Sequence, residues 1–334
     1  MGKLGFTRNR NFIATDVRSQ YTSDDLSTLV PNPFQPLFTG PKAIFNEPDS
    51  IYNNPTIPLL NLLRPYPQFD GEFDGLPKLA ANSRYDSLQL RFEKNAGKYF
   101  TFQGNYTFSR YTDDSSSGAN SWIGYYTYGA PQALDRLKGE YGVSANDTPH
   151  RLTGIFTVAL PVGRGLYFGS NMNRVLDWAI GGWSVSSTFT FQSGQPIPIG
   201  MSIPRLADGN QRPNVTCPNP ASGISYHTAA ATGAPYFNVN CFSDPGDQQL
   251  GNAPRYFSNL RVDGIRTMDA AIRKQFAVRE SLRLQVRFEA FNVFNNTRFG
   301  LPNNAYGDPL FGNVATLAPG FTARRIQMVA RVEF

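Results

Sequence analysis

The sequence predicts an all-β fold of about eight long antiparallel strands that run up and down in chain order. Apolar and polar residues alternate with a period of two along several segments, as in strands whose two faces meet different surroundings. Phe, Tyr and Trp make up 13% of the 334 residues and only 17% are charged, which argues against disorder and against a helical bundle. The 30 glycines and 25 prolines fit long loops between the strands.

In the first half of the chain, three segments alternate clearly and one alternates weakly. The weak segment lies within residues 5–18, where little alternation supports a strand. Residues 84–93 set Leu and Phe against Gln, Arg and Glu, and residues 98–112 set Phe, Gly and Tyr against Thr, Gln, Asn and Ser. Residues 149–160 set Leu, Phe and Val against Arg and Thr. We expect a strand at each place.

The second half contains four more candidate strands. Residues 178–194 set Trp, Val and Phe against Ser, Thr and Gln, and residues 266–276 show a weaker alternation. Residues 281–294 alternate Leu, Val, Phe and Ala with Arg, Gln and Glu. The last strand is expected within residues 322–334, where Val329 is the one apolar residue on the polar face.

The lengths of these strands favour a membrane protein. They run about 10–17 residues, whereas a strand in a globular protein typically has about 5–6 residues. A tilted strand that crosses a bilayer needs about 9–11 residues. No apolar run approaches the roughly 18–20 residues that a transmembrane helix requires. The sequence therefore predicts part of an antiparallel, up-and-down transmembrane β-barrel.

The connections between these strands alternate between long and short. The long ones cover residues 19–83, 113–148, 195–264 and 295–321, and the shorter ones cover residues 94–97, 161–177 and 277–280. Alternate connections of an up-and-down barrel lie on the same side of the membrane, and outer-membrane barrels have short periplasmic turns and long extracellular loops. A soluble sandwich has no reason to sort its loops in this way. We expect the long connections to be extracellular.

Charged residues fall on one face of the predicted strands. A charge that faces lipid at the middle of the bilayer costs roughly 2–4 kcal/mol, so we assign the charged face to the lumen. The lumen-facing arginines are Arg91, Arg151, Arg273, Arg283, Arg287, Arg325 and Arg331, with Glu93, Glu289 and Glu333 beside them. This basic wall points to anionic solutes. Lys274 falls on the apolar face near a strand end, where we expect its side chain to snorkel to polar surroundings.

The sequence carries little chemistry for catalysis. Its two His and two Cys exclude a three-His or a Cys₄ zinc site, and no catalytic or phosphate-binding motif is present. Basic residues form no run of the kind that binds nucleic acid. We expect no enzyme activity, cofactor, metal or nucleic-acid partner. Cys217 and Cys241 share one predicted loop, where they form either one disulfide, as suits an oxidising compartment, or two free thiols.

Four segments of the chain, in this order, resemble a known family. They are residues 62–69 (LLRPYPQF), 83–90 (SRYDSLQL), 105–110 (NYTFSR) and 288–295 (FEAFNVFN). With a final strand that closes on Phe334, they resemble the C-terminal barrel region of TonB-dependent outer-membrane receptors. The likeness is to the large Oar-like members that carry an N-terminal carboxypeptidase-regulatory-like domain, and it covers roughly residues 20–334.

This resemblance implies an outer-membrane transporter of about 22 strands, plugged by an N-terminal domain and energised through TonB. Residues 1–334 show no plug, TonB-contacting segment, regulatory-like domain or signal peptide, and about eight strands fit into them. We therefore expect the C-terminal part of such a receptor, in the outer membrane of a Gram-negative bacterium. It would form part of the wall and the extracellular loops of a solute-uptake channel. The expected partners are outer-membrane lipid, the assembly machinery and an unknown solute, with TonB reached only through the missing regions.

The resemblance also implies a second role for the last strand. Barrels of this family end on an aromatic residue preceded by apolar residues at alternate positions, and here these are Ile326, Met328, Ala330, Val332 and Phe334. The assembly machinery is expected to recognise this stripe as an insertion signal. The plain alternative is that Phe334 merely ends a buried strand.

Two other interpretations of the whole chain remain open. A complete small barrel of eight strands would act as a passive pore or an adhesin, although side chains fill the interior of a barrel of that size. A soluble β-rich binding protein is the second, and heat-modifiable migration on a detergent gel separates it from the membrane interpretations.

Overall fold

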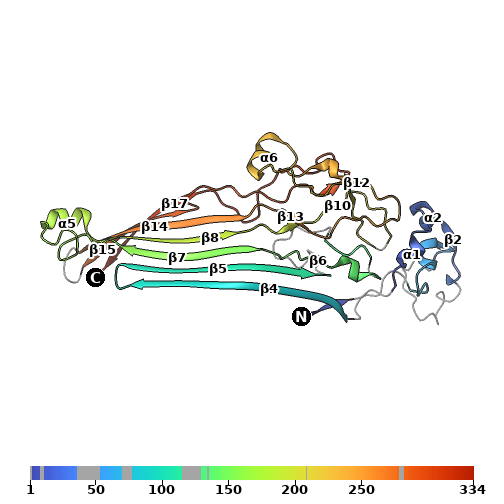
Figure 1. Cartoon of the computed structure of the whole chain (residues 1–334), viewed down its shortest axis with the longest axis horizontal. Helices are drawn as coiled ribbons and strands as arrows, with labels where there is room; N and C mark the ends of the chain where they lie inside the picture. Colours follow the sequence, from blue (N-terminus) through green and yellow to red (C-terminus); the bar gives the residue numbers. More distant parts are fainter. Residues whose placement is uncertain are drawn as a thin grey trace.

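The computed structural model describes residues 2–7, 11–35, 53–69, 77–114, 129–133, 135–207, 209–277 and 282–334. Its main feature is one antiparallel sheet with eight strands on its path (Figure 1). In spatial order these are β1 (Gly2–Thr7), β4 (Pro77–Ala96), β5 (Phe100–Asp113), β7 (His150–Ala159), β8 (Trp183–Gln192), β14 (Ile265–Ala277), β15 (Arg283–Phe291) and β17 (Arg325–Glu333). The two-residue strand β6 (Gly142–Val143) pairs with β5 beside this path. The up-and-down order expected from the sequence is confirmed.

The described sheet is open. β1 pairs only with β4, and β17 pairs only with β15, so these two strands form its edges. The six strands between them are hydrogen-bonded on both sides. The two edge strands therefore present unpaired backbone groups on their outer sides. Strands removed from a larger barrel would do the same.

The expected strands agree with the observed ones except at their ends. In its described residues, the weak segment 5–18 contains the end of β1 and then α1 (Thr15–Arg18), where a strand was considered. β4 is longer than predicted because its first part pairs with β1 and its later part pairs with β5.

The expected strand at residues 178–194 begins too early. α5 (Arg174–Ile180) occupies the first residues of that range. The Asn173 side chain caps it by accepting a hydrogen bond from the backbone N–H of Leu176, and Gly182, at φ 71°, turns the chain into β8. These capping signals override the alternation at the start of residues 178–194. No helix among the described residues is long and apolar enough to cross a membrane.

Connections of the two lengths lie at opposite ends of the sheet (Figure 1). The β4–β5 turn, where Gly97 adopts φ 59°, lies at the same end as α5 and the C-terminus. The expected short turn at 277–280 lies, apart from Ala277, outside the described residues. The long connections gather at the other end, as the alternation of their lengths predicts.

We call the described parts of the four long connections the loop assembly; they cover residues 11–35, 53–69, 114, 129–133, 135–149, 193–207, 209–264 and 292–324. They contain short helices and strands rather than irregular chain. These are α1, α2 (Ser23–Ser27), β2 (Leu29–Pro31), β3 (Thr56–Pro58), α4 (Leu59–Leu62), η3 (Leu137–Glu140), β6, β9 (Pro196–Ile197), β10 (Gly200–Met201), β11 (Asn214–Val215), α6 (Tyr226–Thr232), η4 (Val239–Cys241), β12 (Phe242–Ser243), β13 (Phe257–Arg261) and β16 (Ala305–Tyr306).

The hydrophobic core of the described chain lies in the loop assembly, not between the strands of the sheet. Its largest cluster consists of Ile197, Ile199, Phe237, Cys241, Phe242, Ala253, Phe257, Leu260, Val262 and Phe311. Phe311 comes from the last long connection and the others come from the third. This arrangement follows from a single-layer sheet, whose side chains face outward or inward and have no second layer to pack against.

The first long connection is attached to the others by hydrogen bonds. Asp135 accepts bonds from the backbone and the hydroxyl of Thr15, and Asp247 accepts the same two bonds from Ser23. Burial acts to raise the pKa of Asp135, but the bonds from Thr15 outweigh it and hold that pKa below its usual value. This contribution to stability is therefore complete above the unfolded pKa of about 3.9 and is lost as pH falls through the lower folded pKa.

We predict that the 334-residue chain, expressed and purified alone, will not form discrete channels. The unpaired edges of β1 and β17 favour edge-to-edge association over closure into a pore. The measurement is single-channel conductance in a planar bilayer, where irregular or absent current is expected. Reproducible unitary steps would contradict this prediction and favour a complete small barrel.

Candidate functional site

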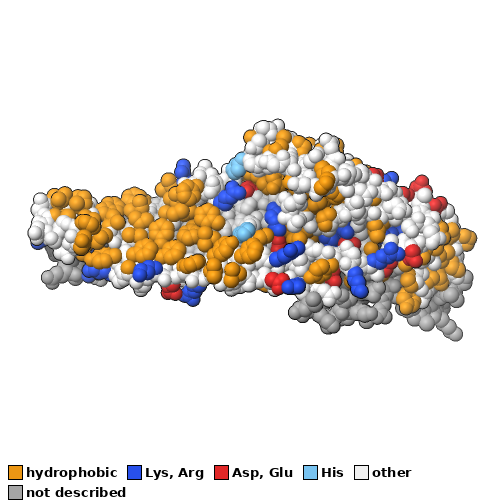
Figure 2. Space-filling view, viewed as in Figure 1, with side chains coloured by type: hydrophobic (Ala, Val, Ile, Leu, Met, Phe, Trp, Pro, Cys, Tyr) orange, Lys and Arg blue, Asp and Glu red, His pale blue; other side chains and the backbone are white. Residues whose placement is uncertain are grey.

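The two faces of the sheet differ sharply in chemistry. The registers place Leu90, Tyr106, Leu152 and Phe191 in one row across four strands, and Phe288 opposite Met328 further along the same face. Many of these large apolar side chains are exposed to the surroundings, and Figure 2 shows them as a continuous field over the strand half of the molecule. On β5 this stripe runs for nine residues, from Phe100 to Phe108, which suits a membrane-crossing strand.

The seven arginines assigned to the lumen all lie on the opposite, polar face: Arg91, Arg151, Arg273, Arg283, Arg287, Arg325 and Arg331. Three of them pair with a glutamate two residues along the same strand: Arg91–Glu93 at 3.0 Å, Arg287–Glu289 at 2.8 Å and Arg331–Glu333 at 3.4 Å. The Arg273 Nε donates to the Ser184 hydroxyl at 3.0 Å. Arg151, Arg283 and Arg325 have no ion pair among the described residues, so they leave positive charge on this face.

Lys274 brings its ammonium to polar atoms at the end of the strand, as expected, but these are backbone carbonyls and not water. Its side chain is 2% exposed, and its ammonium donates to the carbonyls of Ala179 and Gly181. It also lies 5.3 Å from the Trp183 ring. The cation therefore caps the C-terminal end of α5, where free carbonyls and the helix dipole favour a positive charge.

The predicted insertion stripe lies on the apolar face of the edge strand β17. Ile326, Met328, Ala330 and Val332 stand opposite Ala290, Phe288, Val286 and Leu284 of β15. Ile326, Met328 and Val332 are largely exposed, and Phe334 is fully exposed. The structure therefore places these side chains on a free edge and not inside a packed core.

A network of buried charges joins the second and third long connections. Arg255 pairs with Asp113, and the two side chains are 1% and 0% exposed. Arg212 pairs with Glu140 at 2.8 Å, each 5% exposed. The side-chain oxygen of Gln132 accepts from the backbone N–H groups of Arg212 and Gly251. Burial lowers the pKa of Arg212, and the Glu140 carboxylate opposes this shift.

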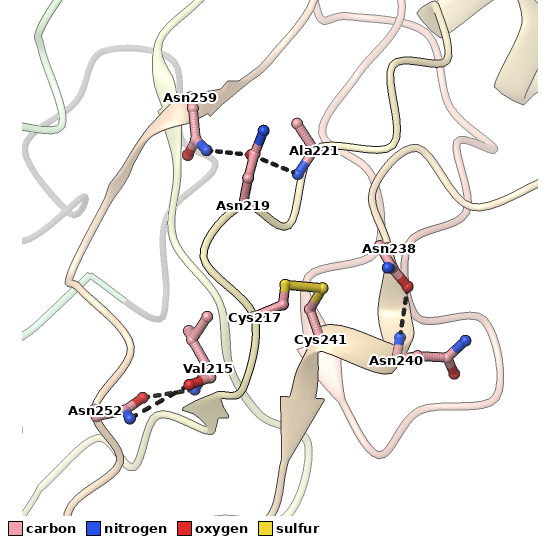
Figure 3. Close-up of a disulfide and its surroundings, with 9 residues drawn as sticks. All are labelled: Val215, Cys217, Asn219, Ala221, Asn238, Asn240, Cys241, Asn252 and Asn259. Carbon is pink, nitrogen blue, oxygen red and sulfur yellow. Dashed lines mark hydrogen bonds between the residues drawn. A yellow bond between two sulfur atoms is a disulfide. The ribbon is translucent and has the colours of Figure 1, made fainter.

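Cys217 and Cys241 form a disulfide inside the third long connection (Figure 3). Asparagine side chains fix the backbone around it: the Asn219 oxygen accepts from Ala221 at 3.0 Å and from Asn259 at 2.6 Å. Asn252 bonds both backbone groups of Val215. The disulfide therefore links the chain after β11 to the start of β12, beside the largest core cluster.

We expect the Cys217→Ala/Cys241→Ala variant to lose about 3 kcal/mol of stability in the loop assembly, because the bond closes a loop across a separation of 24 residues. The measurement is the rate at which protease added to intact cells cuts within residues 193–264, which should rise in the variant. Wild-type cells treated with a reducing agent serve as the matched control and should behave like the variant. Identical cleavage rates in all samples would contradict the prediction.

A cleft opens on the apolar face where the strands meet the loop assembly. Its volume is about 470 Å³. Leu152 and Phe191 line its apolar side, and Tyr226, Tyr236 and Arg266 line its polar side. The hydroxyls of both tyrosines donate to the Arg261 carbonyl, at 3.1 and 3.0 Å. Burial and the nearby Asp263 raise the pKa of Tyr236, which favours the protonated hydroxyl that makes this bond.

The sheet, with one apolar and one polar face and with large loops at one end, has the construction of an outer-membrane β-barrel wall. The chain belongs to the outer membrane beta-barrel domain family, whose model matches residues 11–327. It is therefore a protein of the Gram-negative outer membrane, from a family that is typically not enzymatic.

Among solved structures, the chain is similar to the outer membrane transporter YddB from Escherichia coli, with 10% sequence identity and a TM-score of 0.33. The match covers 76% of this chain and 25% of that one, so the chain spans about a quarter of the length of that structure. No curated protein matches the chain.

Proposed function

We propose that this chain forms part of the wall and the extracellular loops of a TonB-dependent receptor that takes up solutes. The observation that carries the proposal is the open sheet of eight strands, which has one apolar face, one polar face and two unpaired edges. A complete barrel of eight strands would need β1 to pair with β17, and in the described residues each pairs on one side only. Further strands from the same receptor would satisfy both edges.

The proposed orientation puts the loop assembly outside the cell and the β4–β5 turn in the periplasm. Outer-membrane barrels keep their long connections outside, and here the long connections share one end of the sheet (Figure 1). A folded, disulfide-bonded assembly also suits an oxidising exterior. In this orientation the loop assembly is the first part of the receptor that a solute meets.

The proposed solutes are anionic. Arg151, Arg283 and Arg325 form no ion pair among the described residues, although Glu333 stands opposite Arg283, so the polar face keeps an excess of positive charge. Fixed charge on a lumen wall attracts solutes of the opposite sign. Transport through TonB follows from the family resemblance of the sequence and is part of the proposal.

The test compares uptake of labelled anionic solutes, too large for passive pores, in host cells that lack this gene, lack TonB, or lack both. We expect each single deletion to abolish the same fraction of uptake, and the double deletion to add nothing. Uptake that needs this gene but persists without TonB would identify a passive pore. Uptake unaffected by deletion of this gene would exclude the transport role.

A paired variant tests the lumen charge. Arg283→Gln/Arg325→Gln should lower uptake of the anionic solute several-fold at an unchanged level of assembled protein, because it removes two positive charges from a face on which arginines outnumber glutamates. The matched control is Arg283→Lys/Arg325→Lys, which keeps both charges and should retain most uptake.

A further inference from the structure

We propose that the cleft between the apolar field and the loop assembly binds the phosphate-bearing headgroup of an anionic glycolipid of the outer leaflet. The side chains that line its floor, Leu152 and Phe191, share one face of the sheet with the rest of the apolar field. The cleft therefore opens toward lipid and away from the lumen. The inference needs only this outward face and does not depend on the proposed transport role.

The cleft lies away from the open edges of the sheet. The strands that contribute to it, β5, β7, β8 and β14, are each hydrogen-bonded on both sides. Additional strands would join at β1 and β17, which β4 and β15 separate from the cleft strands β5 and β14, and would leave this part of the outward face uncovered. Lipid is then the natural neighbour of the cleft.

The height of the cleft matches the headgroup region of a bilayer. On three strands, a basic residue stands on the outward face one step beyond the last apolar residue of the stripe: Arg110 after Phe108, His150 before Leu152, and Arg266 before Met268. Figure 2 shows histidine and other basic side chains around the hollow where the apolar field ends. Basic side chains at this depth can reach phosphate groups while the acyl chains cover the apolar residues below them.

Arg266 is the central cation of this surface. Its side chain is exposed, and it has no hydrogen bond or ion pair among the described residues. It also lines a second hollow of about 40 Å³, together with His227 and Arg298. A guanidinium group between two hollows can bind a phosphate through two parallel N–H···O hydrogen bonds.

Two buried carboxylates lie near the cleft. The ion pair with Arg261 neutralises Asp147, whereas Asp263 keeps its negative charge and lines both hollows with Arg266. Arg298 lines the second hollow as well, so the cations Arg266 and Arg298 still exceed the single charge of Asp263. Asp263 is buried and accepts a bond from the backbone N–H of Phe299 at 3.0 Å. Asp147 is buried and pairs with Arg261 at 2.6 Å. The imidazole of His150 is hydrogen-bonded to the Tyr106 hydroxyl at 2.8 Å, which holds the ring at the rim of the cleft.

The experiment measures binding of lipid A that carries two phosphates to the purified full-length protein in detergent, by native mass spectrometry. Arg266→Gln should weaken binding about tenfold, because a charge-assisted bond to the phosphate is lost. Arg266→Lys should bind lipid A more weakly than wild type and more tightly than Arg266→Gln, since lysine keeps the charge but lacks the planar guanidinium. The control Arg136→Gln changes an exposed arginine of the loop assembly outside the cleft and should bind like wild type. Heat-modifiable migration confirms that each variant is folded.

Further measurements separate a lipid headgroup from free phosphate. A tenfold excess of inorganic phosphate should leave the lipid bound, and lipid A without phosphates should bind as weakly to wild type as the intact lipid binds to Arg266→Gln. Equal binding by wild type and Arg266→Gln would overturn the proposal. Displacement of the lipid by inorganic phosphate would overturn it in favour of a free-phosphate site.

Discussion

Replacing Arg255 with alanine is expected to unfold much of the loop assembly while the sheet stays intact. The change leaves the fully buried Asp113 carboxylate without its ion-pair partner, and removing one partner of a buried pair typically costs about 3–5 kcal/mol. Arg255 also donates to the Glu140 carbonyl at 2.9 Å, so the second connection loses a further contact. Limited proteolysis in detergent should cut the variant within the loop assembly and leave a protected core of strands.

The control for this variant is Arg205→Ala in the same long connection. Arg205 pairs with Asp244, but the two side chains are 41% and 47% exposed, and exposed pairs contribute about 0–1 kcal/mol. The protease resistance of the Arg205→Ala variant should therefore remain close to that of wild type. If Arg255→Ala and Arg205→Ala were equally resistant, the buried network would not hold the loops together.

Deleting Phe334, or changing it to serine, is expected to reduce assembly in the outer membrane to a small fraction of the wild-type level. Phe334 is fully exposed, and it continues the outward stripe of a strand whose far edge is free. Aromatic side chains are common at the membrane interface of such barrels. We expect the assembly machinery to recognise this terminal residue. The measurement is the amount of heat-modifiable protein in the outer-membrane fraction of cells that express the full-length protein.

Glu333→Gln is the neighbouring control. Glu333 lies on the polar face, pairs with Arg331 at 3.4 Å and is partly exposed, so its loss should have a mild effect. Assembly of the Phe334 variants at the wild-type level would show that the terminal residue only ends a strand and carries no signal.

The sheet could be predicted from the sequence because its two faces meet lipid and water, so apolar and polar residues alternate along each strand. Along β15 and β17 each outward residue is apolar and nearly every inward residue is polar, so the period alone reveals the strand and its faces. The prediction failed where another local signal competed, as at Asn173 and Gly182, which cap α5 and turn the chain into β8. It also did not identify the partners of Lys274, which are backbone carbonyls that no side-chain pattern reveals.

The loop assembly could not be predicted in the same way. Its contacts join residues far apart in the chain: Gln132 bonds Gly251 across 119 positions, and Arg255 reaches Asp113 across 142. No periodicity links such pairs, and the segments between them read only as polar loops rich in glycine and proline. The outward cleft was missed for the same reason, since Tyr226 of α6, Tyr236 of the segment after it and Arg266 of β14 come together only in the folded chain.

The shared core of the loop assembly makes the two ends of the wall mechanically unequal. At one end, Phe311 packs against Phe237 and Phe242, and Asp135 and Asp247 hold the first connection, so all four long connections belong to one cooperative unit. At the other end, the described connections, the β4–β5 turn and the α5 segment, make no comparable cluster. Backbone hydrogen bonds fix the spacing of the strands along the sheet, whereas the shared core couples the loops, so we expect a disturbance of one long connection to spread to its neighbours before it reaches the turns.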